Sequence, residues 1–287
     1  MTQQTPALSA QAEALSPHLE AAIKSGELSV PMLPEVAGRV VSLSQDPDSD
    51  ASQLAQLIQG DQSLAGHVMR IANSAAYSPN GSMVSLQQAI TRLGMNLISD
   101  IALAASISTK MFDAPGFERH IELTWQHALT TALWSKEIAR VCRRNVEATF
   151  LCGLLHSIGR PVVLQLVIEL SRDKQLPISH EDALALEERY QKSVGAAVAA
   201  KWDMPKIVCE AITFFDDYDN ASIARDQTTM VNGGAQFARH SLSPEILDLD
   251  TLTGLQVLAD LNLYQDEVER LLDMKDSIAS TREAMSA

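Results

Sequence analysis

Cysteine is scarce in this chain of 287 residues, which contains three: Cys142, Cys152 and Cys209. No two of them have the Cys-x-x-Cys spacing of a zinc or redox site. Free thiols fit a reducing compartment. Aromatic residues are also few, at 5%, so the 46% apolar content comes mainly from Leu, Ala, Val and Ile. Because Ala and Leu are strong helix formers, the composition favours an α-rich fold with a sizeable core.

Positive charge is in short supply. There are 22 Lys and Arg residues against 36 Asp and Glu, which gives a formal net charge of -14 and a pI near 4.8. An acidic chain repels phosphate backbones and anionic lipid surfaces. The charge therefore predicts no nucleic-acid partner and no membrane-surface partner, and its simplest consequence is solubility.

Long apolar runs are also missing. The longest blocks, near residues 101–105 and 161–168, are shorter than the roughly 20 residues of a membrane span. Residues 1–22 have no basic region followed by an apolar block, so they do not read as a secretory signal. We therefore expect no membrane segment and a cytoplasmic location.

Common catalytic motifs are absent too. The sequence has no Gly-x-x-x-x-Gly-Lys-Ser/Thr phosphate loop and no Gly-x-Ser-x-Gly nucleophile turn. The acidic group at His180-Glu181-Asp182 is interpreted as helix capping and dipole matching. These absences exclude the most readily recognised phosphate-binding and esterase sites.

Helical signals fill the first part of the chain. After a polar, Ala-rich stretch over residues 1–28, expected to be at most loosely helical, five short helices are predicted up to about Met111. Asp50 and Asp61 are candidate N-caps, and Ser85 opens a capping box with Gln88. The Asp113-Ala114-Pro115-Gly116 segment breaks the chain and indicates a boundary.

Longer helices follow. The patterns predict helices at about 118–143 and 146–158, and the second is apolar nearly all round, which is typical of a buried helix. Ser179 is a candidate N-cap of a further long helix, and two more helices are expected near 223–239 and 265–285. No segment shows a convincing strand pattern.

A series of short motifs runs through the chain in a fixed order. They are Leu33-Pro34, Asp46-Pro47, Ala55, Leu57-Ile58, Asp61, Leu64, Arg70-Ile71-Ala72-Asn73-Ser74-Ala75-Ala76-Tyr77, Ala89-Ile90, Leu93-Gly94, Trp125-Gln126-His127, Gly153-Leu154-Leu155-His156-Ser157-Ile158-Gly159, Val194-Gly195-Ala196 and Lys201-Trp202-Asp203-Met204-Pro205. In this order the motifs resemble the HDOD family, a relative of the HD phosphohydrolases. Within them, Asn73, Ser74 and Gly94 are interpreted as structural.

The resemblance implies an all-α, two-lobed helical HDOD fold with an HD-like helical core in the C-terminal lobe. We expect an N-terminal extension at 1–28 and an HDOD domain at 29–225, with lobes of about 29–114 and 115–225. Residues 226–287 are expected to form C-terminal helices that pack on the HD-like lobe.

The resemblance also locates a site whose ligand set is incomplete. HD phosphohydrolases hold one or two metal ions with a His, a His-Asp pair and further His or Asp residues. Here His127 matches the first His and His156 the His of the pair, but Ser157 stands where the enzymes have Asp. A hydroxyl is a weak ligand for hard divalent cations, which prefer carboxylate oxygen.

The later positions of the same pattern also depart from it. Gln191 stands where hydrolase relatives tend to place a further His, and Phe215 with Asp216 stands where a His-His pair often closes the site. Too few ligands are left for a catalytic metal. We therefore expect a vestigial site with no catalytic residue and no cofactor.

Three functions are compatible with these residues. The first is a bacterial signal-transduction protein that acts through protein contacts, with partners of unknown identity and with a homo-oligomer left open. The alternative is a divergent metal-dependent phosphohydrolase, acting on a phosphomonoester or cyclic nucleotide, with a divalent metal on His127, His156 and Asp216. A third is a sensor whose cleft binds a nucleotide without cleaving it.

Overall fold

The computed structural model describes residues 8–25, 28, 30–46, 48–78, 83–107 and 111–286, and its regular elements are all helical. The expectation of an all-α fold is confirmed. In chain order the elements are α1 (Ala10–Ser25), α2 (Glu35–Gln45), α3 (Ala51–Gln59), α4 (Gln62–Ala72), α5 (Leu86–Leu93), α6 (Met95–Ser106), α7 (Glu118–Val141), α8 (Val146–Leu155), α9 (Gly159–Lys174), α10 (His180–Lys201), α11 (Lys206–Phe214), the 3-10 turn η2 (Tyr218–Asn220), α12 (Arg225–Leu242), α13 (Leu249–Thr253), α14 (Gln256–Asp260), α15 (Gln265–Leu272) and α16 (Lys275–Ser286).

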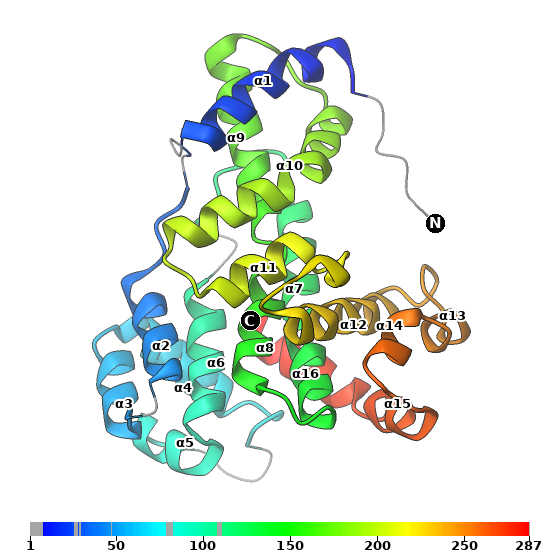
Figure 1. The fold of residues 1–287 in the computed structure, drawn as a ribbon. Coiled ribbons are helices and arrows are strands. Elements are labelled where there is room, and N and C mark those ends of the chain that lie inside the picture. The colour runs from blue at the N-terminus through cyan, green and yellow to red at the C-terminus, as the bar shows by residue number, and fades with distance from the viewer. Residues whose placement is uncertain are drawn as a thin grey trace.

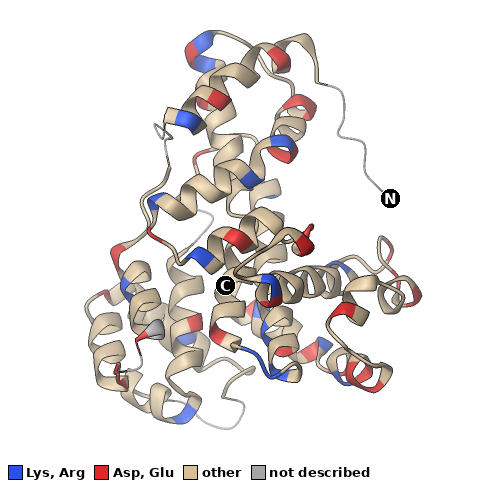
Figure 2. Ribbon diagram, in the orientation of Figure 1, with Lys and Arg blue, Asp and Glu red and all other residues tan. Residues whose placement is uncertain are grey.

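Helix α7 is the centre of the arrangement. It contacts α8, α9, α12, α15 and α16, while α2–α6 pack together at the lower left of Figure 1 and α1 lies at the opposite end, against α9 and α10. In the view of Figure 2, Lys and Arg are scattered among Asp and Glu rather than gathered on one face.

Local capping explains where the short helices begin. The Asp50 carboxylate accepts hydrogen bonds from the N–H groups of Ser52 and Gln53, and Asp61 accepts one from Leu64. Ser85 likewise accepts from the N–H of Gln88. These caps satisfy N–H groups that the first turn leaves without a helical partner, so the three predicted N-caps are confirmed.

The motif residues Asn73, Ser74 and Gly94 lie in this group of helices. Asn73 ends α4, and its side-chain amide pairs with both the N–H and the C=O of Met83, at 2.6 and 2.9 Å. Gly94 joins α5 to α6 with φ of 90°, a conformation that favours glycine. Helix α6 ends at Ser106, short of the predicted Met111, and residues 108–110 lie outside the described ranges.

The apolar helix α8 ends earlier than its sequence pattern predicted. It stops at Leu155 because i→i+3 hydrogen bonds, from Ile158 to Leu155 and from Arg160 to Ser157, tighten the chain into a turn. The stretch 146–174, which spans this turn, is long and apolar enough to cross a membrane, but 89% of its most apolar window is buried inside the fold. It is the core of the molecule, and the turn carries His156 and Ser157.

Two glycines let neighbouring helices come unusually close. A Cβ on Gly159 would lie 1.9 Å from the carbonyl oxygen of Gln191 and 2.7 Å from the nitrogen of Gly195. On Gly234 it would lie 2.1 Å from the Oγ of Ser135. Only glycine fits at these contacts, between α9 and α10 and between α12 and α7.

The ends of the chain are more ordered than the sequence suggested. Helix α1 buries Ala12, Leu15 and Leu19, and Ser9 binds Asp182 through its N–H and its Oγ, at 3.1 and 2.8 Å. A helix in this stretch agrees with the sequence, but over residues 10–25 it is packed against the fold and not loose. At the other end, the helix expected over 265–285 is divided into α15 and α16, and the short α13 and α14 were not predicted.

A buried ion pair joins α6 to α7. Lys136 Nζ contacts the Asp100 carboxylate, and each residue is only 6% exposed. Burial raises the pKa of Asp100 to about 6, although the adjacent Lys136 opposes this. The Lys136 ammonium also lies 5.5 Å from the centre of the Phe150 ring.

Candidate functional site

A large cleft lies where α7, α10, α12 and the turn before α9 meet. Its volume is about 740 Å³. All six positions that the resemblance singled out line it: His127, His156, Ser157, Gln191, Phe215 and Asp216. The structure therefore brings these residues together, from four separate segments of the chain.

The two histidines face each other at the base of the cleft. Their ring centres are 6.0 Å apart, and the Phe215 ring packs edge-on against His156 at 5.0 Å. His156 Nδ1 lies 2.7 Å from the carbonyl oxygen of Gly153. Because a carbonyl only accepts, this contact places the proton on Nδ1 and leaves the lone pair of Nε2 free.

Both imidazoles are neutral at physiological pH. Burial, the neighbouring His127 and the positive Arg160 lower the pKa of His156 to about 3. Burial, Arg239 and Arg160 lower the pKa of His127 to about 4. Neutral imidazoles are acceptors and ligands rather than cations.

The lowered pKa values predict a loss of stability in acid. The unfolded histidines bind protons below about pH 6.5 while the folded ones do not, so the free energy of unfolding falls as pH drops from 6.5 towards 4. Between pH 7 and pH 5, wild type should lose about 2 kcal/mol more than His156→Gln. Urea denaturation at both pH values measures the difference, and parallel losses would show that His156 does not titrate this way.

The carboxylates of the cleft already have partners. Asp216 lies 2.5 Å from Lys192 Nζ, and Glu188 lies 2.8 Å from Arg160. Behind them Glu187, which is 1% exposed, contacts His120 at 2.9 Å and Arg160 at 3.5 Å. No carboxylate in the described lining is left to neutralise a cation.

These residues do not fit a divalent metal ion. Across the residues that the structure describes, no group of three or more His, Cys, Asp or Glu side chains could hold one. The donor set at the cleft consists of two neutral imidazoles, a hydroxyl and an amide, and the guanidinium groups of Arg160 and Arg239 line the same cleft. Hard divalent cations prefer carboxylate oxygens, and nearby positive charge opposes their binding.

Several lining residues could not be found from the sequence. Arg160 directly follows Gly159, the last residue of the His156 motif. Its position in the cleft depends on ion pairs with Glu187 and Glu188, which lie on α10. Asn232 and Arg239 belong to α12, in the part assigned to the tail, and Asn232 donates to the Phe215 carbonyl at 2.8 Å. No local pattern marks either residue.

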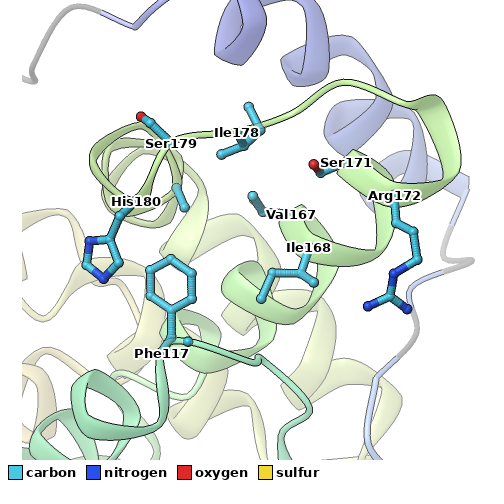
Figure 3. Close-up of a pocket in the computed structure, with 10 residues that line it drawn as sticks. Phe117, Val167, Ile168, Ser171, Arg172, Ile178, Ser179 and His180 are labelled. Carbon is cyan, nitrogen blue, oxygen red and sulfur yellow. The ribbon is translucent and has the colours of Figure 1, made fainter.

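A second cavity of about 360 Å³ lies between the start of α7 and the α9–α10 connection. Figure 3 shows Phe117, Val167 and Ile168 along it, with Arg172 at its edge. Phe117 stacks on His180 with ring centres 4.5 Å apart. The acidic motif around His180 thus has structural contacts: the N–H of Asp182 donates to the capping Ser179 Oγ, and its carboxylate accepts hydrogen bonds from the N–H and Oγ of Ser9.

The family model of the HDOD domain matches residues 30–218. That is well over half of the chain, so this protein belongs to the HDOD domain family. The cleft described above lies mostly within the matched region.

Solved structures agree with this assignment of the fold. A candidate metal-dependent phosphohydrolase from Shewanella amazonensis SB2B is 22% identical, with a TM-score of 0.71 over 96% of this chain and 100% of that one. An HDOD domain protein of unknown function from Geobacter sulfurreducens is 21% identical, with a TM-score of 0.71 over 93% and 98%. A candidate signal transduction protein from Marinobacter aquaeolei VT8 is 23% identical, with a TM-score of 0.68 over 96% and 67%.

Among curated proteins, an uncharacterized protein of Treponema pallidum is 22% identical over 201 residues. The match covers 67% of this chain and 38% of that protein. The chain therefore corresponds to much less than the full length of this relative.

Proposed function

We propose that this HDOD protein is a bacterial, cytoplasmic signal-transduction protein that acts through protein contacts and whose HD-like site does not catalyse hydrolysis. The observation that carries the proposal is the state of the carboxylates. Ser157 replaces the acidic residue of the His-Asp pair, and Asp216 and Glu188 are held by Lys192 and Arg160. A metal-activated water needs a metal, and this lining offers it too few ligands.

The similar proteins support the proposal only in outline. One solved relative is described as a candidate signal transduction protein and another as a candidate metal-dependent phosphohydrolase. The choice between the two roles rests on the residues of this chain. We propose further that it uses no metal or other cofactor and has no nucleic-acid or membrane partner.

The proposal predicts that protein purified without chelator contains iron, manganese and zinc at background level. Mass spectrometry of the metals in wild type and in a His127→Gln, His156→Gln double variant should give equal, far substoichiometric values. Neither protein should hydrolyse p-nitrophenyl phosphate or its diester. The alternative, a divergent phosphohydrolase, requires near-stoichiometric metal in wild type that the double variant loses.

A further inference from the structure

Three buried side chains of the cleft offer polar atoms that the protein does not use. His156, Ser157 and Gln191 are 4, 6 and 5% exposed, and all three line the cleft. His156 spends Nδ1 on Gly153 and keeps Nε2 free. Within the described part of the chain, the Ser157 hydroxyl and the Gln191 amide have no hydrogen-bond partner, yet neither is sealed from the cleft.

Such a grouping is unusual for a side-chain cluster with a purely structural role. Polar side chains that are mostly buried are usually hydrogen-bonded to other protein atoms or to an ordered molecule. The neighbouring Asn232 and Glu187 follow that rule and are satisfied by protein atoms. Because Ser157 and Gln191 open onto the cleft, their polar atoms are available to a molecule bound there.

The cleft also contains a positive charge without a partner. Arg239 lines it, and no ion pair with a described carboxylate involves Arg239, whereas Arg160 is held by Glu187 and Glu188. Asp216 is likewise paired with Lys192, so Arg239 is the charged lining residue whose guanidinium has no ion-pair partner among the described residues. The lining as a whole is neutral, with Arg160 and Arg239 against Glu188 and Asp216, whereas the chain has a net charge of -14.

Part of the rim of the cleft is apolar. Leu123 is 48% and Ile246 69% exposed, and both line the opening together with Leu242. A volume of about 740 Å³ lies within the range of small-molecule sites, which commonly join apolar walls to a few polar anchors. The dimensions suit a metabolite-sized molecule.

We propose that this cleft binds a small organic anion without any metal. A carboxylate or phosphate oxygen accepts hydrogen bonds from the Arg239 guanidinium, and the buried hydroxyl of Ser157 and amide of Gln191 provide further polar contacts. An N–H or O–H of the ligand donates to His156 Nε2, and the carbon skeleton contacts Leu123 and Ile246. The inference rests on the proposed function in one respect, since the ligand is held and not hydrolysed.

The test is titration calorimetry in excess EDTA with inorganic phosphate, AMP and citrate, each to 10 mM. At least one probe should bind wild type, and Arg239→Gln should weaken it at least tenfold. Arg270→Gln, which removes the same charge from an exposed position on α15, should bind like wild type. Binding of phosphate and AMP alone would identify a phosphate ligand, and binding of citrate alone a carboxylate.

The results that overturn the inference are separate from those that overturn the proposed function. Absence of binding by all three probes, or equal binding by wild type and Arg239→Gln, rejects the anion site. Equal binding by wild type and Ser157→Ala would show that the ligand does not contact the Ser157 hydroxyl. Release of phosphate from AMP by wild type, with a dependence on added metal, rejects the non-catalytic function whether or not the anion site stands.

Discussion

Replacing Gly159 by alanine should lower the free energy of unfolding by about 3 kcal/mol, at the upper end of the cost of overpacking. The new methyl group would lie 1.9 Å from the Gln191 carbonyl oxygen, and backbone cannot move aside as a flexible side chain can. Helices α9 and α10 would have to separate. Because Gln191 lines the cleft, the variant should also lose the calorimetric signal of any anion that wild type binds.

Gly66 is the matched control for this prediction. It lies in the exposed part of α4, and a Cβ there would meet no atom within 4 Å. Gly66→Ala should stabilise the protein by up to about 1 kcal/mol, because alanine is the better helix former. Urea denaturation of both variants measures the contrast, and similar effects at the two positions would contradict the close approach of α9 and α10.

Replacing Lys136 by methionine should lower the free energy of unfolding by about 3–5 kcal/mol, because the change leaves the buried Asp100 carboxylate without its partner. The loss should be larger at pH 8 than at pH 5. Burial already raises the pKa of Asp100 to about 6, and removing Lys136 raises it further. A folded carboxyl with a raised pKa binds protons that the unfolded one does not, so stability falls as pH rises.

A second variant separates the missing partner from simple loss of packing. In the Asp100→Leu, Lys136→Met double variant no buried charge is left, and replacing a buried ion pair by apolar residues is often neutral or stabilising. The double variant should therefore recover most of the stability that Lys136→Met loses. If thermal and urea denaturation show that it is as unstable as the single variant, the pair is not the cause.

Features governed by neighbouring residues could be predicted from the sequence. Asp50, Asp61 and Ser179 each cap a helix by binding an N–H two or three residues on, so a short segment contains the whole interaction. The division between α15 and α16 at Asp273 and Met274 has no glycine or proline to mark it. The sequence alone therefore predicts one continuous helix there.

Features that depend on distant contacts could not be predicted. Helix α1 is ordered by Asp182, which lies 173 residues from Ser9, and no property of residues 8–25 alone indicates this. Likewise the resemblance located His127, His156 and Gln191, but the pairing of Arg160 with Glu188 and the position of Arg239 emerge only from the packing of α9, α10 and α12. The function of the six predicted residues stays a prediction until the cleft is tested.

The wall that α12 gives to the cleft has a consequence for comparing HDOD proteins. The family match ends at residue 218, whereas Asn232 and Arg239 lie beyond it. A domain defined by the match alone would therefore be open on one side of its own cleft. We therefore expect that exchanging residues 219–287 between two chains with the same HDOD core would exchange Asn232 and Arg239, and with them the proposed anion contact, while leaving the matched core unchanged.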